Sequence, residues 1–257
     1  MNARAQFVAF STIVRKEVTR FTRIWVQTLI PPAITMALYF VIFGNLIGSR
    51  IGPMGGFDYM AFVVPGLIMM SVISNSYSNV VSSFYSAKFT KCIEEIQVSP
   101  TPNYIILCGY VLGGCLRGLM VGAIVTVLSL FFTKLHIHNL AITISIIFLT
   151  AFLFSLAGMV NAIFANSFDD ISIIPTFVLT PMTYLGGVFY SISLLPEFWQ
   201  GVSKLNPILY MVNAFRYGIL GVSDVNVTTA FAGIMIFIVV LFIFCLYLLE
   251  KSARLRS

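Results

Sequence analysis

Charged residues are scarce in this chain of 257 residues: Asp, Glu, Lys and Arg together make up 9% of it, against roughly 25% in an ordinary soluble domain. A soluble fold of this length could not cover its surface with so few charges. Hydrophobic residues reach 59%, in runs long enough for membrane helices rather than barrel strands. The composition therefore excludes a soluble enzyme, a nucleic-acid-binding protein and a disordered protein. It predicts an all-α integral membrane protein.

Motifs for catalysis and for nucleotide or metal binding are absent as well. The sequence has no GxSxG, HExxH or GxxxxGK[ST] pattern, so it predicts no catalytic site, no metal site and no P-loop nucleotide in this chain. The 4 cysteines show no CxxC spacing, and most lie in apolar runs, which favours small buried side chains over disulfides. Ionisable groups inside the apolar runs are also few, which argues against an ion-coupled carrier.

Six apolar runs are each long enough to cross the hydrocarbon core of a bilayer, which is about 30 Å thick. They are residues 25–47, 59–84, 104–132, 140–165, 171–190 and 228–249. Pro31 and Pro32 should kink or reset the first of them. No segment between the runs is long enough for a second domain, so the sequence predicts one transmembrane domain over residues 1–257.

The basic residues are distributed unevenly between the two sides that six spans create. The segments 1–24, 85–103, 166–170 and 250–257 carry ten Lys or Arg residues, and the segments on the other side carry four. Cytoplasmic segments hold the excess of Lys and Arg in membrane proteins. Both termini are therefore predicted to be cytoplasmic, with Lys134 outside.

Residues 191–223 separate the fifth and sixth runs and remain rather apolar. Two short helical patterns, near 195–205 and 208–220, are divided by Asn206-Pro207. Each is too short to span, so we expect re-entrant half-helices over 191–220 that dip into the outer leaflet, where protein must shield their irregular backbone. A poorly formed seventh span is the alternative.

Residues 7–24 form an amphipathic pattern with a basic face, which is typical of a helix in the membrane interface. Glu17 is the exception, because it falls within the apolar arc. Its carboxylate either pairs with Arg20 one turn on or projects toward a cytoplasmic partner.

The loop between the second and third runs carries a second amphipathic pattern, over residues 89–98. Ile93 lies on its apolar stripe, whereas Lys91, Glu94 and Glu95 occupy the other faces. An apolar stripe on a short helix below the membrane must be covered. Lipid headgroups and a groove on a partner protein are the two alternatives.

Two polar features lie inside the apolar runs. Ser71, Asn75, Ser78 and Ser82 form a stripe on the second run, and Ser74 and Asn79 widen it. The stripe is suited either to close helix packing or to the wall of a polar path. Arg117 is the basic residue deepest in a span, so it must face protein or water, or reach an interface.

The stretch from Leu179 to Arg216 carries a specific signature. It reads Leu179-x-x-Met182-x-x-Leu185-Gly186-x-Val188, then Leu195-Pro196, Pro207-Ile208-x-Tyr210 and Arg216. This pattern resembles the signature of the ABC-2 family of transporter permeases, in which Pro196, Pro207, Tyr210 and Arg216 are the matching positions. Supporting stretches extend the resemblance along the whole chain.

The resemblance implies a bacterial inner-membrane permease that exports an amphipathic drug, lipid or glycan. In this family the N-terminal helix lies along the membrane, and the loop after the second span carries a coupling helix. That helix docks on a separately encoded ATPase subunit, which binds ATP and Mg²⁺. Two permeases and two ATPases form the working unit, and the half-helices cap the outer end of the pathway. The expected ATPase contacts are Glu17, Lys91, Ile93, Glu94 and Glu95.

Residues at the end of the fifth run are candidates for the pathway and its outer gate. Aromatic side chains can hold an apolar solute without strong directionality, and paired glycines let a gate bend. The candidates are Phe177, Tyr184, Gly186, Gly187, Phe189 and Tyr190. Packing between two copies of the permease is the alternative role. An ion-coupled secondary transporter and a membrane-bound assembly factor are the rival functions.

Overall fold

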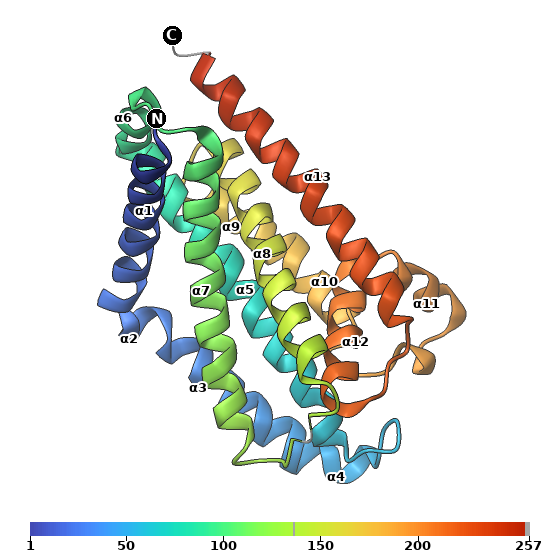
Figure 1. The fold of residues 1–257 in the computed structure, drawn as a ribbon. Coiled ribbons are helices and arrows are strands. Elements are labelled where there is room, and N and C mark those ends of the chain that lie inside the picture. The colour runs from blue at the N-terminus through green and yellow to red at the C-terminus, as the bar shows by residue number, and fades with distance from the viewer. Residues whose placement is uncertain (136, 255–257) are drawn as a thin grey trace.

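The computed structural model describes residues 1–135 and 137–254, and the regular elements in these ranges are helices apart from one isolated bridge between Met54 and Phe57 (Figure 1). The α-helices are α1 (Ala3–Arg23), α2 (Trp25–Thr28), α3 (Ile30–Val41), α4 (Gly48–Ile51), α5 (Tyr59–Phe89), α6 (Cys92–Val98), α7 (Asn103–Ser129), α8 (Leu140–Phe164), α9 (Asp170–Ile174), α10 (Thr180–Leu185), α11 (Glu197–Lys204), α12 (Pro207–Leu220) and α13 (Val227–Arg254). Three short segments, η1 (Ile42–Ile47), η2 (Pro175–Leu179) and η3 (Ile192–Leu194), have π or 3₁₀ geometry.

Helix α5 forms the centre of the bundle. Within the described residues, five helices are long and apolar enough to cross a membrane, and 89% of the apolar window of α5 is buried, against 17% for the first and the last of the five. Helices α7, α8 and α12 pack against α5, whereas α13 lies along the outside of α8 (Figure 1). The first and last spans therefore present their apolar side chains to lipid or to another protein.

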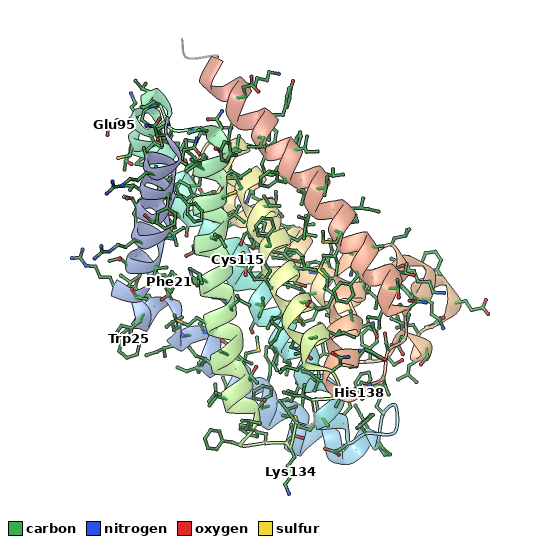
Figure 2. The ribbon with its side chains drawn as sticks, viewed as in Figure 1. Phe21, Trp25, Glu95, Cys115, Lys134 and His138 are labelled. Atoms are coloured by element: carbon green, nitrogen blue, oxygen red, sulfur yellow. The ribbon has the colours of Figure 1, made fainter. Side chains whose placement is uncertain are left out.

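The bundle has two distinct ends. Helix α1 begins and α13 ends beside α6, at what is called here the α6 end, and α4 marks the opposite α4 end (Figure 1). Glu95 projects from the α6 end and Lys134 from the α4 end (Figure 2). Both ends of the described chain therefore lie on one side of the bundle, as an even number of crossings requires.

The first predicted span is interrupted rather than continuous. The helix breaks at Leu29, because Pro31 and Pro32 lack the N–H groups that would continue the hydrogen-bond ladder. An earlier interruption at Ile24 separates α1 from α2, and the hydroxyl of Thr28 donates to the carbonyl of Phe21 across it, at 2.9 Å. Beyond Leu29 the helical path runs through a π segment to Ile51, four residues past the predicted end at 47.

The segment predicted to span over 171–190 is also shorter and less regular than expected. It follows α9, the π segment η2 and α10, and it ends at Leu185. Pro175 and Pro181 disturb its hydrogen bonds, and Gly187 stops it with a left-handed φ of 70°. Residues 186–190 therefore form a loop rather than the last turns of a span.

Helix α1 packs lengthwise against α7 instead of crossing beneath the bundle. The Tyr104 hydroxyl donates to Gln6 at 3.1 Å, and a Cβ placed on Gly113 would overlap the Cβ of Glu17. Contacts at both points show that the two helices run in the same direction. Glycines on α7 allow this close approach. The orientation of α1 relative to the membrane surface stays a prediction.

The predicted helix 89–98 is two elements. Phe89 is the last residue of α5, Lys91 adopts a left-handed φ of 60°, and α6 begins at Cys92. Its cysteine is exposed, contrary to the expectation of buried thiols, whereas Cys115 and Cys245 are buried.

The expected helix pair before the last span is present as α11 and α12. The Asn206 side chain caps α12 by accepting from the amide of Ile208 at 3.0 Å, and Pro207 takes the first helical position. Most of α12 is buried against α5, α8 and α13.

Candidate transport site

The central helix α5 exposes one line of side chains along its length. Between Tyr59 and Ala87 the residues that are not buried are Met70, Ser74, Ser78, Ser82 and Ser86. They recur every four positions, so they share one face of the helix. We call the four serines the serine line. Apart from Met70, this accessible face of an otherwise buried helix carries hydroxyl groups, and we call the space along it the groove.

The serine line overlaps the predicted stripe only in part. Ser78 and Ser82 belong to both, but Ser71 and Asn75 are buried. The Ser71 hydroxyl donates to the carbonyl of Ile68 at 2.7 Å, and the Asn75 amide donates to the carbonyl of Ser71 at 2.9 Å. Two of the four predicted residues therefore serve packing, and two face the groove.

Two arginines from other helices bind the amides that flank the serine line. Arg20 of α1 donates to the side-chain oxygen of Asn79 at 2.8 Å and to its carbonyl at 3.0 Å. Arg117 of α7 donates to the side-chain oxygen of Asn75 at 3.3 Å. Arg117 thus faces protein beside the groove, which is one of the alternatives expected for it.

Glu17 lies inside the same cluster. It is fully buried; the Ser83 hydroxyl donates to it at 2.6 Å, Arg20 lies 3.5 Å away and Lys16 lies 3.9 Å away. The structure therefore contains the internal pairing, and the carboxylate faces α5 rather than the outside of the molecule. A buried ion pair in this position fixes α1 on the bundle.

Four aromatic rings gather near the α4 end of the groove. Phe189 stacks on Phe43 with ring centroids 4.7 Å apart and on Tyr184 at 5.7 Å, and Tyr39 lies 6.0 Å from Phe189. The cluster joins two of the predicted pathway residues to the first span. Phe177, by contrast, is 74% exposed and stands apart from these rings.

The loop after α10 is held tightly against α5. A Cβ on Gly66 would overlap the carbonyl oxygen of Val188, so only glycine fits there. Gly186 is also confined, because a Cβ on it would lie 2.8 Å from the side chain of Ile208. The Tyr59 hydroxyl donates to the carbonyl of Phe189 at 3.2 Å, and half-buried Tyr190 completes the loop. The predicted glycine pair thus sits in a packed turn.

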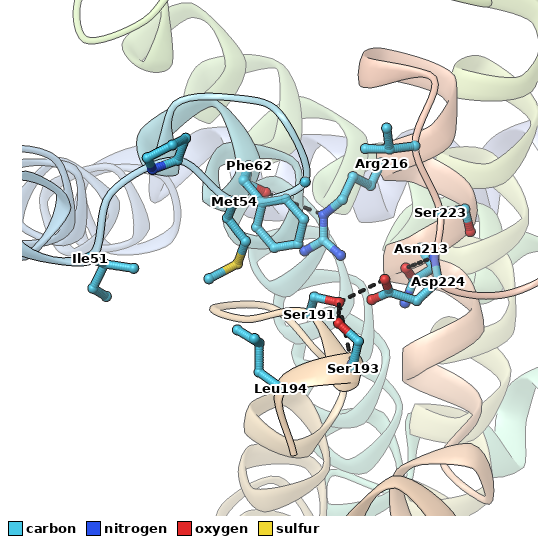
Figure 3. A pocket seen from close by; sticks show the side chains of 13 residues that line it. Ile51, Met54, Phe62, Ser191, Ser193, Leu194, Asn213, Arg216, Ser223 and Asp224 are labelled. Atoms are coloured by element: carbon cyan, nitrogen blue, oxygen red, sulfur yellow. Dashed lines mark hydrogen bonds between the residues drawn. The ribbon is translucent and has the colours of Figure 1, made fainter.

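Arg216, on α12, binds the backbone of the loop after α10 (Figure 3). Its side chain is 1% exposed, and it donates to the carbonyls of Phe62 at 3.2 Å and Gly187 at 2.7 Å. Its guanidinium also lies 3.9 Å from the ring centroid of Phe62. The signature arginine therefore links α12, α5 and the loop.

A cavity of about 380 Å³ opens beside Arg216. Asp224 lines it and accepts from the Ser191 hydroxyl at 2.7 Å and from the amide of Ile192 at 3.2 Å (Figure 3). Its own amide donates to Asn213 at 3.0 Å. A carboxylate near the guanidinium offsets part of the cost of burying that charge.

The remaining signature residues organise the half-helices. Pro196 precedes the first turn of α11, Pro207 opens α12, and the Tyr210 hydroxyl donates to the carbonyl of Lys204 at 2.9 Å. Asn206 donates to the carbonyl of Met182 at 2.6 Å, which ties the pair to α10. These positions shape the α4 end of the bundle and carry no chemistry of their own.

Helix α6 buries only part of its apolar surface. Ile93 is 2% exposed and belongs to the hydrophobic core, whereas Val98 is 89% exposed and Phe89, the last residue of α5, is 65% exposed. Lipid and a partner therefore both remain alternatives for covering the rest.

The polar side chains of this region are Lys91, Glu94 and Glu95, which we call the α6 tip. Lys91 and Glu95 are exposed, and Glu94 is half-buried.

Several residues at these sites have no signal in the sequence pattern alone. Tyr39 and Phe43 lie in an apolar run like any other aromatic residue, and Asp224 looks like a loop carboxylate. Lys88 looks like an ordinary flanking lysine, although it donates to the carbonyls of Ile163 and Ala165, both at 2.7 Å, where α8 ends. Ser86 could have been found by extending the four-residue spacing of Ser74, Ser78 and Ser82 beyond the end of the second run.

No cluster of three or more His, Cys, Asp or Glu side chains that could hold a metal ion occurs in the described ranges.

Comparisons with known proteins match nearly the whole length of the chain. The family model described as ABC-2 type transporter matches residues 8–220. The chain is 59% identical to the inner membrane transport permease YadH of Escherichia coli K12, over 98% of both chains. It is also 23% identical to nodulation protein J of Rhizobium leguminosarum bv. viciae, over 83% of both chains. A second nodulation protein J, from Sinorhizobium fredii, is 23% identical over 80% of this chain and 79% of its own.

Proposed function

This chain belongs to the ABC-2 family of transporter permeases, and from that membership we propose that it forms the pathway of an ATP-driven exporter. Like the relative named as an inner membrane permease, it is a multi-pass protein of the bacterial inner membrane. ATP and Mg²⁺ are bound by a separate ATPase subunit, and the exported substrate is an amphipathic drug, lipid or glycan.

The serine line is the observation that carries this proposal. An amphipathic molecule needs a polar wall for its headgroup and apolar surface for its tail. The serine line supplies the first, and the aromatic cluster of Tyr39, Phe43, Tyr184 and Phe189 supplies the second near the α4 end.

The α6 end is proposed to face the cytoplasm, with α9 to α10 as a sixth and irregular crossing. Native Cys92 allows a direct test, because it is exposed at that end while Cys115 and Cys245 are buried. A membrane-impermeant maleimide should label Cys92 in inside-out vesicles and not in right-side-out vesicles. Labelling from the outer face would overturn the orientation.

The α6 tip is proposed to contact the ATPase. Ile93 anchors the helix in the core, so a push on the tip moves α5 with it. Closure of two ATPase subunits on ATP would then shift a permease pair from inward-open toward outward-open. Glu17 is left out of this contact because its carboxylate is buried.

Charge reversal at the tip tests that contact. Glu94→Lys combined with Glu95→Lys should reduce co-purification of the ATPase, because rim charges set association rate and orientation. Glu197→Lys, on exposed α11, is the matched control. Equal ATPase recovery with the double variant and the control would remove α6 from the interface.

Filling the groove tests transport itself. Ser78→Leu combined with Ser82→Leu should abolish ATP-dependent uptake of an amphipathic probe into inside-out vesicles, while the ATPase still binds ATP. Ser11→Leu on the exposed part of α1 makes the same chemical change outside the groove. Normal uptake with both leucines in place would contradict the proposed path.

A further inference from the structure

The cluster of Lys16, Arg20 and Arg117 beside the serine line has more positive than negative charge. Glu17 is the carboxylate within it, and it pairs with Lys16 and Arg20. Among the described residues, no carboxylate lies within 4.0 Å of Arg117. The three cations and one carboxylate leave a net charge of about +2 in a partly buried place, and an uncompensated charge there is costly.

The two guanidinium groups also keep unused donors. The Nε atoms of Arg20 and Arg117 are buried and have no hydrogen-bond partner in the described structure. Each arginine uses Nη2 for its amide on α5, at Asn79 and Asn75 respectively. Those amides are one helical turn apart, so the two guanidinium groups lie close enough to share one ligand.

The cluster lies inside the bundle, near the middle of the two long helices that flank it. Arg117 is the fifteenth of the 27 residues of α7, and its partner Asn75 is the seventeenth of the 31 residues of α5. Arg20 binds Asn79, one helical turn closer to the α6 end. A headgroup that moves along the groove from the inner leaflet would therefore meet Arg20 first and Arg117 next.

Apolar surface lies next to the cationic cluster. Leu116 and Met120 are 40% and 37% exposed on α7 beside Arg117, and half-buried Ser78 and Ser82 border the amide of Asn79 on α5. A bound anion would thus have hydroxyl groups on one side and space for an acyl chain on the other.

We propose that Arg20 and Arg117, supported by Lys16, bind the phosphate headgroup of an amphipathic substrate as it enters the groove from the inner leaflet. Planar guanidinium groups bind phosphate oxygens through paired hydrogen bonds. A phosphate monoester carries about −1.5 to −2 charges, which balances the cluster. This inference rests on the proposed export function, because it names the class of substrate for the same groove.

Binding to the purified permease tests the site without the ATPase or transport. The probe is labelled dioctanoyl phosphatidate, with dioctanoyl phosphatidylcholine and inorganic phosphate as competitors. Phosphatidate should bind saturably and resist both competitors. Equal displacement by phosphatidylcholine would overturn recognition of the phosphate, and equal displacement by inorganic phosphate would overturn recognition of an amphiphile.

Matched variants assign the binding to named residues. Arg117→Gln should weaken phosphatidate binding about tenfold, the loss of one charge-assisted contact. Arg15→Gln, an exposed arginine on α1, should leave it unchanged. Arg117→Lys keeps the charge and should recover most of the affinity. Unchanged affinity in Arg117→Gln would overturn the site.

Glu17→Gln should change the affinity for phosphatidate in the opposite direction to Arg117→Gln. Removing the carboxylate raises the net charge of the cluster, so phosphatidate should bind several-fold more tightly, an effect that a merely structural cluster would not produce. Weaker or equal binding would count against the proposal. Arg20→Gln probes the site from α1 should Arg117→Gln fail to fold. Loss of binding with intact transport would end this inference and leave the proposed function standing.

Discussion

Two arginines serve different purposes at two levels of helix α5, one near its α4 end and one near its middle. Near the α4 end, Arg216 is enclosed by carbonyl oxygens of Phe62 and Gly187 and by the ring of Phe62, with Asp224 in the adjoining cavity. Near the middle of α5, Arg117 has one hydrogen bond at 3.3 Å and no carboxylate within 4.0 Å among the described residues. Both arginines keep one buried donor without a partner, Nη1 in Arg216 and Nε in Arg117. Arg216 nevertheless has more partners, and it has a carboxylate nearby.

This difference indicates that Arg216 stabilises the fold, whereas Arg117 is available to bind a ligand. Carbonyls turned toward a buried cation lose their partner when that cation is removed, which is costly. A cation without an anion already bears an unfavourable energy, so removing it costs little until a ligand binds. Comparing the stability of matched variants at the two arginines can therefore distinguish the structural role from the ligand-binding role.

The largest effect is expected from Arg216→Gln. The change leaves the carbonyls of Phe62 and Gly187 without their donor and Asp224 without its counter-charge, so the permease should lose about 3–5 kcal/mol of stability. Thermal unfolding of the purified protein in detergent measures this. Arg117→Gln should change the same midpoint little in the absence of an anionic amphiphile.

Arg50→Gln, at an exposed position on α4, is the control for loss of a charge at the α4 end. Equal destabilisation by Arg117→Gln and Arg216→Gln would break the comparison, because both arginines would then be structural.

A second, smaller effect tests how firmly the loop after α10 is held against α5. Gly66→Ala places a methyl group directly against the carbonyl oxygen of Val188, and this backbone atom must shift. Overpacking of this kind costs about 1–3 kcal/mol. Disulfide trapping or hydrogen exchange of residues 186–190 would also show the loop moving away from Phe62 and Arg216.

Gly201→Ala is the matched control, since nothing lies within 4 Å of a Cβ there and the glycine is inside α11. It should stabilise that helix by up to about 1 kcal/mol. If Gly66→Ala unfolds no earlier than Gly201→Ala, the loop is not packed as described.

The apolar runs predicted the bundle well because length and hydropathy determine which helices can cross a membrane. All five candidate spans among the described residues begin within one residue of the predicted starts, at Trp25, Tyr59, Asn103, Leu140 and Val227. The half-helix pair followed from Asn206-Pro207, whose capping and missing N–H act locally.

The irregular elements were not predictable in the same way. Two π segments and the early end at Leu185 depend on how prolines and glycines pack against neighbouring helices. The helical wheel placed Glu17 in an apolar arc with Arg20 as one possible partner, but it did not show that Ser83 of α5 would also bind the carboxylate. Partners from distant helices decide the role of a buried charge, and one-dimensional patterns do not contain them.

The smallest expected effect concerns the turn that joins α5 to α6. Lys91 has a φ of 60°, which costs a residue with a Cβ about 1–2 kcal/mol. Lys91→Gly should relieve this strain and stabilise the permease by up to about 1 kcal/mol, offset by the larger freedom of glycine in the unfolded chain. Lys91→Ala loses the same charge but keeps the Cβ, so the difference between the two thermal midpoints measures the effect of the backbone conformation.

Recovery of the ATPase with the same two variants measures the effect of the charge, because both variants remove it. If the charge of Lys91 contributes to the ATPase contact, both variants should bind the ATPase more weakly, and to the same extent. An alanine variant as stable as the glycine variant would show that the turn is unstrained, and α6 would then be held by Ile93 rather than by the geometry at Lys91.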